Sequence, residues 1–209
     1  MQYRKSFLRA IRDNLSKEDL DTLFKPLPSP DIGDFRGAME LSGRTGFDAA
    51  EIGVHKGFLS QFILTHLPGL CTLFMVDPWK EWGDDERYRT AGHRIVHEDQ
   101  EANFQEASAN VADFADRRRV LRDVSVEAAK EVADGSLTFV FIDGDHSYEG
   151  CKEDLHAWYK KVKPGGLLMG HDYGRRKWGV AKAVNEFTDA EGLELQVYPK
   201  SVWTCRIPA

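Results

Sequence analysis

The stretch of sequence that decides the fold is residues 139–149, which read Phe-Val-Phe-Ile-Asp-Gly-Asp-His-Ser-Tyr-Glu. Residues 163–173, Lys-Pro-Gly-Gly-Leu-Leu-Met-Gly-His-Asp-Tyr, have the same form. In each, an apolar run that is typical of a buried parallel strand is followed at once by acidic and imidazole side chains. In an open α/β sheet, ligands bind in the crevice beyond the carboxyl ends of the strands. The side chains that we expect to meet there are Asp143, Asp145, His146, His171 and Asp172.

Strand-like apolar runs alternate with helical patterns along the rest of the chain. The strands are predicted at residues 47–52, 71–76, 120–121, 137–142, 166–169, 193–198 and 202–207, and the helices at 59–67, 98–115, 126–132, 149–161 and 180–187. Such alternation implies parallel strands joined by right-handed crossovers. The short connection at residues 199–201 predicts a hairpin. We therefore expect an α/β fold with a seven-stranded, mostly parallel sheet whose last strand is antiparallel.

The N-terminal part of the chain differs in character from the rest. Apolar residues over 7–24 form a rough helical stripe that Ser16 interrupts as a candidate N-cap, and residues 25–33 hold three prolines, which favour an extended connector. We expect residues 1–46 to form a helical arm and connector, and residues 47–209 to form the main domain. The arm could cover its own sheet or that of a second copy, so a homo-oligomer is one expectation.

The bulk composition limits the partners and the compartment. The chain has 209 residues, a formal net charge of -6 and a pI near 5.7, which argues against undirected binding to nucleic acid or to an anionic membrane. Its three cysteines form no Cys-x-x-Cys pair, and no stretch approaches the roughly 18 apolar residues of a membrane-spanning helix. We expect a soluble, cytoplasmic protein with no nucleic-acid or membrane partner.

Residues 50–57, Ala-Glu-Ile-Gly-Val-His-Lys-Gly, join the first predicted strand to its helix. Glycines at such a turn let the backbone approach a ligand, but the spacing is not Gly-x-Gly-x-x-Gly, and the chain has no Gly-Lys-Ser/Thr phosphate loop. Asp77 ends the second strand, where an acidic side chain commonly holds ribose hydroxyls. A ligand with a ribose and no phosphate therefore fits best. Two alternatives stay open: Asp77 as a turn residue before Pro78, and Glu51 as an ordinary strand-end acid.

Together these motifs resemble those of class I S-adenosylmethionine-dependent methyltransferases, in the branch that includes macrocin-type sugar O-methyltransferases. The resemblance extends over roughly residues 47–206, and its motifs are Glu51-x-Gly53-x-x-x-Gly57, Asp77-Pro-Trp79, residues 142–148 and residues 163–173. It implies a Rossmann-like three-layer sandwich in which residues 47–209 bind S-adenosylmethionine. The cofactor-binding residues that it implies are Glu51, Gly53, Gly57, Asp77, Asp123, Ser125 and Asp143.

The resemblance also implies how the cofactor lies. The backbone near Gly53 and Gly57 would contact the methionine part, Asp77 would hold the ribose, and residues 122–125 would border the adenine. In many members of the family a third glycine stands at the position of His55, so this chain departs from the pattern there.

A site for a divalent metal ion is a further implication of the resemblance. In metal-dependent relatives an Asp after the fourth strand and an acidic pair after the fifth bind Mg²⁺, and the matching residues are Asp143, His171 and Asp172. An imidazole suits Mn²⁺, Fe²⁺ or Zn²⁺ better, so Mg²⁺ is the default and another divalent ion the alternative. His146 matches the position of the catalytic base in these relatives, and an imidazole suits proton removal at neutral pH. The catalytic residues that the resemblance implies are His146 and Asp143. The alternative for His146 is a helix-start residue bonded to Asp145.

We therefore expect an S-adenosylmethionine-dependent methyltransferase that acts on a small hydroxylated acceptor with a divalent metal and a histidine base. The alternative is a non-catalytic, methyltransferase-like binding or sensor domain, since a fold alone never proves chemistry. Sugar, phenol and amine acceptors stay open. Residues 80–97, rich in charged and aromatic side chains, are a candidate lid. Residues 175–178 are either an acceptor clamp or a plain surface loop, and residues 117–119 are expected to be a solvated helix end.

Overall fold

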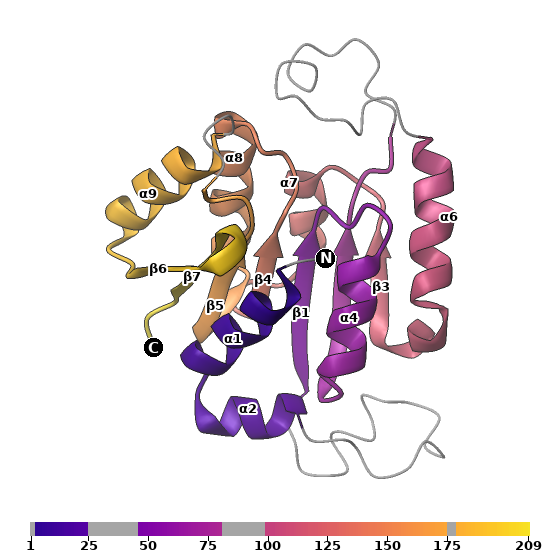
Figure 1. Cartoon of the computed structure of the whole chain (residues 1–209), viewed down its shortest axis with the longest axis horizontal. Coiled ribbons are helices and arrows are strands. Elements are labelled where there is room, and N and C mark those ends of the chain that lie inside the picture. The colour runs from indigo at the N-terminus through magenta and orange to yellow at the C-terminus, as the bar shows by residue number, and fades with distance from the viewer. Residues whose placement is uncertain (1–2, 25–45, 81–98, 175–178) are drawn as a thin grey trace.

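The computed structural model describes residues 3–24, 46–80, 99–174 and 179–209, and these residues form an α/β sandwich around one sheet (Figure 1). The sheet has seven strands in the order β3-β2-β1-β4-β5-β7-β6. Their bounds are Phe47–Ile52 for β1, Leu70–Val76 for β2, Arg118–Leu121 for β3, Leu137–Ile142 for β4, Val162–Gly170 for β5, Leu195–Tyr198 for β6 and Val202–Arg206 for β7. The expected fold class is confirmed.

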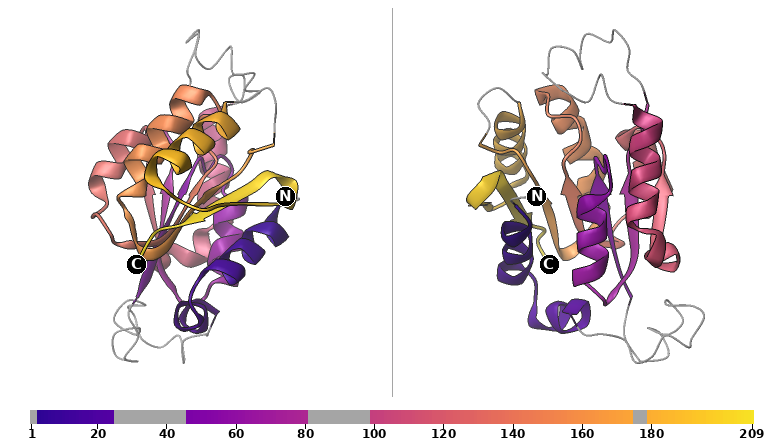
Figure 2. Two further views of the ribbon diagram at one scale, coloured as in Figure 1. Left: turned by 90° about the vertical axis from the view of Figure 1, so that its left-hand side faces the viewer. Right: turned by 45° about the vertical axis from the view of Figure 1, so that its right-hand side comes forward.

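The helices lie on both faces of the sheet (Figure 2). Their bounds are Arg4–Asn14 for α1, Lys17–Phe24 for α2, Phe58–His66 for α4, Gln100–Asn110 for α6, Ser125–Ala128 for α7, Tyr148–Tyr159 for α8 and Val180–Glu191 for α9. Short 3₁₀ helices span Ala112–Arg117 (η2), Ala129–Glu131 (η3) and Pro199–Ser201 (η4). Helices α1, α4 and α6 pack in one apolar core, and α7, α8 and α9 pack in the other. The protein therefore has the three layers that the motif resemblance implied.

The order of the strands places a crevice at the centre of the sheet. β1 pairs in parallel with β2 on one side and with β4 on the other, while β2 pairs with β3 and β4 with β5. The chain thus runs outward from β1 to β3 and then returns to the opposite side at β4. Ligands of open α/β sheets bind at such a reversal, beyond the carboxyl ends of the strands.

The last two strands form a hairpin that turns back through η4. β7 is antiparallel to both β5 and β6 and lies between them, which confirms the expected antiparallel last strand. The hairpin turn contains Lys200 and Ser201 with φ of 66° and 63°. This left-handed backbone is uncommon for residues other than glycine. The turn lies close to the end of β5, since the carbonyl of Ser201 accepts a hydrogen bond from the amide of Tyr173.

Strand β4 is buried on both faces, as the continuous apolar run predicted. Phe139 and Phe141 belong to the core that contains α1 and α4, whereas Val140 and Ile142 belong to the core that contains α8. A parallel strand covered by helices on both sides has no reason to alternate polar with apolar residues.

The N-terminal arm packs on its own sheet. Phe7 and Ile11 of α1 are fully buried, and the Phe7 ring makes edge-to-face contacts with Phe139 and Phe141 at centroid distances of 5.8 and 5.3 Å. Ser16 caps α2, because its Oγ accepts a hydrogen bond from the amide of Asp19 at 3.1 Å. The division of the chain at residue 46 stays a prediction, and the connector at 25–33 lies outside the described residues.

The expectation of a solvated helix end at residues 117–119 is wrong for Arg117. This side chain is 8% exposed, and its guanidinium donates hydrogen bonds to the carbonyls of Leu64, Leu67 and Leu70 at 3.2, 2.8 and 3.0 Å. The first two carbonyls are at the C-terminal end of α4, where backbone acceptors lack partners within the helix. A cation is favourable at the C-terminal end of a helix, although burial lowers the pKa of Arg117.

Several predicted elements begin or end elsewhere. β5 starts at Val162 rather than at residue 166, with an irregular register opposite β4, and the helix predicted over 98–115 ends at Asn110 before η2 begins. Most of the candidate lid and all of residues 175–178 lie outside the described residues. Among the residues that the structure describes, no helix is both long and apolar enough to cross a bilayer.

Replacing Phe7 with Ala should lower the free energy of unfolding by about 3–5 kcal/mol, because it leaves a cavity between α1 and β4. Urea unfolding followed by circular dichroism measures this change. Val197, which is 51% exposed, is the control, and Val197→Ala should change the free energy of unfolding by less than about 0.5 kcal/mol. A loss below about 1 kcal/mol for Phe7→Ala would show that the arm is not part of the cooperative core.

Candidate active site

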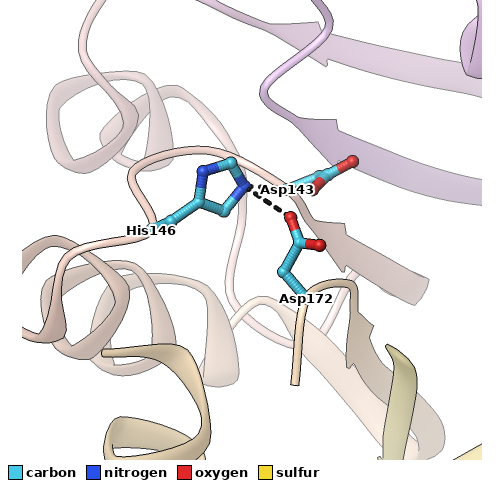
Figure 3. A group of neighbouring side chains, drawn as sticks. All are labelled: Asp143, His146 and Asp172. Atoms are coloured by element: carbon cyan, nitrogen blue, oxygen red, sulfur yellow. Dashed lines mark hydrogen bonds and ion pairs between the residues drawn. The ribbon is translucent and has the colours of Figure 1, made fainter. Parts of the chain in front are cut away.

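Two neighbouring strands end side by side and carry the central side chains of the site. Ile142, the last residue of β4, pairs with Gly170, the last of β5. Asp143 follows β4 directly, and His171 and Asp172 follow β5. Backbone bonds continue the sheet one residue further, since the His171 amide donates to the Ile142 carbonyl at 3.1 Å. The side chains after the two strands therefore leave the sheet at the same level (Figure 3).

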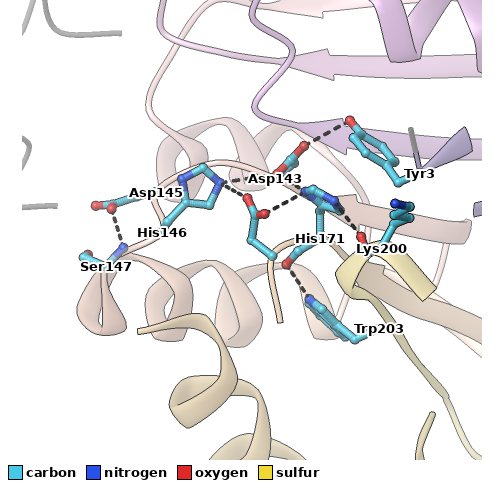
Figure 4. A network of polar contacts seen from close by, with 9 residues as sticks. Tyr3, Asp143, Asp145, His146, Ser147, His171, Lys200 and Trp203 are labelled. Carbon is cyan, nitrogen blue, oxygen red and sulfur yellow. Dashed lines mark hydrogen bonds and ion pairs between the residues drawn. The ribbon is translucent and has the colours of Figure 1, made fainter. Parts of the chain in front are cut away.

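Four of the five expected side chains meet in one cluster (Figure 4). His146 Nε2 lies 3.3 Å from Asp143 Oδ1 and 3.0 Å from Asp172 Oδ2. His171 Nδ1 lies 3.6 Å from Asp143 Oδ1 and 3.0 Å from Asp172 Oδ1. The fifth, Asp145, accepts a hydrogen bond from the amide of Ser147 at 2.8 Å at the start of α8. We call Asp143, His146, His171 and Asp172 the Asp/His cluster.

The backbone of Asp172 is unusual. Its φ is 60°, in the left-handed region that costs free energy for a residue with a side chain. The loop is tied to the hairpin, because Trp203 Nε1 donates to the carbonyl of His171 at 3.2 Å and the Tyr173 amide donates to the carbonyl of Ser201 at 3.2 Å. This turn directs the Asp172 carboxylate to His146, as Figure 3 shows.

The four side chains of the Asp/His cluster shift one another's pKa values. Burial alone would lower the pKa of His146 and His171, but the hydrogen bonds that the rings donate to Asp143 and Asp172, together with the charges of these carboxylates, raise it to about 9 in each. Burial alone would raise the pKa of both carboxyls, but the two imidazoles lower it. The two carboxylates thus favour the protonated form of each imidazole. A divalent cation can supply the same positive charge while the imidazoles release protons.

Three residues of the Asp/His cluster, Asp143, His146 and Asp172, could hold a metal ion. One ligand atom each from Asp143, His146 and Asp172 lie within 4.8 Å of one another. His171 is suited as well, because its Nε2 lies 2.9 Å from the carbonyl of Lys200. A ring nitrogen that donates to a carbonyl leaves the other nitrogen free to bind a metal. A mixture of carboxylate oxygens and imidazole nitrogens suits Mn²⁺, Fe²⁺ or Zn²⁺ better than Mg²⁺.

A cavity of about 180 Å³ adjoins the cluster at the crevice. Of the expected cofactor-binding residues, those in its wall are Gly53, Asp77, Ser125 and Asp143. Asp143 therefore belongs both to the cavity and to the catalytic cluster.

Gly53 and Asp77 shape the loops that line this cavity. Gly53 has φ of 85°, and a Cβ atom there would lie 2.2 Å from the carbonyl oxygen of Asp143, so only glycine lets the loops after β1 and β4 come together. The Asp77 carboxylate accepts hydrogen bonds from the amides of His55 and Trp79, each at 2.8 Å. Asp77 thus makes the turn of the alternative interpretation and also lies in the cavity wall. Burial raises its pKa, although these bonds oppose the shift.

The other expected cofactor-binding residues do not line the described cavity. Glu51 is buried and accepts a hydrogen bond from Ser60 Oγ. Gly57 has φ of 71° and lies so close to α6 that an added Cβ atom would be 2.9 Å from the Cα of Ala107. The carboxylate of Asp123 accepts a bond from the amide of Val124 at 2.7 Å. Their cofactor roles stay predictions.

Two residues of the site were not among the sequence-based candidates. Asp154 of α8 lines the cavity and is 4% exposed, and burial raises its pKa to about 7 despite a hydrogen bond with Ser125. A signal existed for Asp154, because it lies among Cys151, Leu155 and Trp158 on the buried face of α8. The other residue is Tyr3, whose hydroxyl donates to Asp143 Oδ2 at 3.2 Å. No local pattern connects Tyr3 with Asp143.

Comparison with known proteins agrees with the methyltransferase family that the sequence motifs resemble. A family described as "Methyltransferase domain" matches residues 50–173, which is more than half of the chain. Uncharacterized protein y4gI of Sinorhizobium fredii is 27% identical over 184 residues, which are 82% of this chain and 19% of that protein. Uncharacterized protein R132 of Acanthamoeba polyphaga mimivirus is 31% identical over 91 residues, which are 42% of this chain and 41% of that protein. The chain thus spans less than half the length of each of these two relatives.

Solved structures share the fold at low sequence identity. The O-methyltransferase NovP has a TM-score of 0.58 and 18% identity, with 82% of this chain and 75% of that chain covered. The calicheamicin methyltransferase CalS11 has a TM-score of 0.56 and 15% identity, with 93% and 91% covered. A protein of Corynebacterium glutamicum has a TM-score of 0.58 and 18% identity, with 98% and 97% covered. With the family match, the motifs and the fold in agreement, the chain belongs to the methyltransferase-domain family and has the fold of class I S-adenosylmethionine-dependent methyltransferases.

Proposed function

We propose that this methyltransferase transfers the methyl group of S-adenosylmethionine to an oxygen atom of a small hydroxylated acceptor, with a divalent cation and a histidine base. The observation that carries the proposal is that the Asp/His cluster lies at the ends of β4 and β5, directly beside the cavity. Asp143 is common to both, so a donor in the cavity and an acceptor at the cluster would be neighbours.

The chemistry explains why such a cluster is useful. Methyl transfer from a sulfonium is an in-line displacement, so the protein must align donor and acceptor, exclude water and provide a deprotonated nucleophile. A hydroxyl group is too weakly acidic to lose its proton unaided. A base within hydrogen-bond reach removes the proton, and a divalent cation, when bound, lowers the pKa of the hydroxyl. An amine has less need of a cation, so the cluster favours oxygen as the attacking atom.

We assign different roles to the two imidazoles. His171 is the proposed metal ligand, together with Asp143 and Asp172, because its Nε2 is already bonded to the Lys200 carbonyl and its Nδ1 faces both carboxylates. His146 is the proposed base. Its Nε2 would take the proton from the hydroxyl group of the substrate that receives the methyl group. This nitrogen also lies among the candidate ligand atoms, so metal binding must be measured for a His146 variant.

The cavity is the proposed binding site for the cofactor. Its wall contains the close backbone approach at Gly53, which suits the methionine part, and the Asp77 carboxylate, which can accept hydrogen bonds from ribose hydroxyls. Ser125 lies in the wall where the adenine is expected. These three contacts suit a nucleoside ligand without phosphates.

Asp77→Asn should weaken S-adenosylmethionine binding by about 10- to 100-fold, because hydrogen bonds to a charged group contribute about 1.5–3 kcal/mol. Isothermal titration calorimetry with S-adenosylmethionine and S-adenosylhomocysteine measures the affinity. The matched control is Asp113→Asn, which changes the same group at an exposed position of η2 outside the described cavity and should have a much smaller effect. No binding by the wild type at millimolar cofactor would exclude the proposed cofactor site.

Asp172→Asn should weaken Mn²⁺ binding by at least about tenfold, since it removes one ligand charge without changing the side chain's shape. Calorimetry or electron paramagnetic resonance with Mn²⁺ alone gives the affinity. Asp134→Asn is the matched control, because Asp134 pairs with Lys161 at an exposed position away from the cluster. If the wild type binds none of Mg²⁺, Mn²⁺, Fe²⁺ and Zn²⁺, the metal-assisted route is wrong.

His146→Gln should slow S-adenosylhomocysteine formation by about 10²- to 10⁴-fold on acceptors that the wild type methylates, while the affinity for cofactor stays unchanged. A panel of sugars and phenols, with product detected by mass spectrometry, provides the assay. If His146→Gln instead loses Mn²⁺ binding as strongly as Asp172→Asn, then His146 is a ligand and not the base. A wild type that binds the cofactor but turns over no member of the panel supports a binding domain.

A further inference from the structure

Tyr3, at the start of the N-terminal arm, contacts the Asp/His cluster. Its hydroxyl donates a hydrogen bond to Asp143 Oδ2 at 3.2 Å. Its ring lies against the imidazole of His171, with centroids 4.1 Å apart and planes inclined by 33° (Figure 4). Thus one side chain touches both Asp143 and His171, from a segment that precedes them by more than a hundred residues and lies outside the matched range of 50–173.

The arm holds Tyr3 in this place firmly. The Tyr3 ring stacks on Phe141, with centroids 6.0 Å apart and planes at 12°, and the next residue, Arg4, donates from Nη2 to the carbonyl of Phe58 at 3.0 Å. One turn further along α1, Phe7 is fully buried against β4. Tyr3 is therefore fixed by the sheet and by α4 and not only by its contacts with the cluster.

The two carboxylate oxygens of Asp143 contact different partners. Oδ2 accepts from Tyr3, while Oδ1 faces His146 and His171. The carboxylate torsion of an aspartate is otherwise broad, so the bond from Tyr3 restricts the rotation of this carboxylate and keeps its second oxygen turned to the two imidazoles. The ring contact has a parallel effect on His171, whose imidazole lies between Tyr3 and Asp172.

We propose that Tyr3 is a positioning residue of the active site: its hydroxyl orients Asp143 and its ring orients His171, so that both present their ligand atoms to a divalent cation. The inference rests on the proposed metal-assisted function and adds to it a residue of the N-terminal arm. Groups that hold metal ligands in place typically affect metal affinity about 10- to 100-fold.

Tyr3→Phe tests the hydroxyl, because it keeps the ring and its packing. Mn²⁺ affinity, measured on the full chain by calorimetry with Mn²⁺ alone, should fall by about tenfold or more, while S-adenosylmethionine affinity and the melting temperature stay near those of the wild type. Rotation of the Asp143 carboxylate should also change the electron paramagnetic resonance spectrum of bound Mn²⁺.

Tyr198→Phe is the matched control at the other end of α1. The Tyr198 hydroxyl accepts a hydrogen bond from Asn14 Nδ2 at 2.9 Å and donates to Asp13 Oδ2 at 3.3 Å, so its removal loosens the arm without touching the cluster. This variant should bind Mn²⁺ like the wild type. Equal Mn²⁺ affinity of Tyr3→Phe and wild type overturns the inference, and so does an equal loss in both variants. A wild type that binds no Mn²⁺ refutes the metal proposal itself, and the inference with it.

Discussion

The active site depends on three parallel strands, β1, β4 and β5, that end at the same level. Ile52 pairs with Ile142, and Ile142 with Gly170, so the residues that follow are neighbours across the sheet edge. Gly53 then lets the loop after β1 press against the backbone of Asp143. A residue with a Cβ atom at this point would push apart the loops that form the cavity and the cluster. The chemistry at the edge is thus a consequence of how the strands are paired and of one position without a side chain.

Charge explains why the side chains at this edge occur together. A lone carboxylate buried to the degree of Asp172, which is 4% exposed, would be costly. Two carboxylates side by side would be worse, unless positive charge lies between them. In this protein the imidazoles of His146 and His171 provide it, and both rings contact both carboxylates. The four groups therefore stabilise one another in the folded chain.

Much of the fold could be predicted from the sequence because its signals are local. β4 has the predicted bounds, since an unbroken apolar run ends at an acidic residue, and the hairpin was visible in a three-residue connection. Element ends that depend on tertiary contacts were less accurate: β5 begins earlier, and η2 replaces the end of a predicted helix. The position of β7 between β5 and β6 has no local signal either.

The same distinction holds for the candidate site. Asp143, His146, His171 and Asp172 could be grouped because each follows a strand end, but their mutual contacts depend on loop conformations such as the left-handed backbone of Asp172. Tyr3 could not be found, because only the packing of α1 on β4 brings it to Asp143. The double membership of Asp143, in the cavity wall and in the cluster, has a thermodynamic consequence. If the proposed donor and the proposed cation both bind, each must change the affinity of the other by the same factor, because a coupling free energy between two sites is reciprocal.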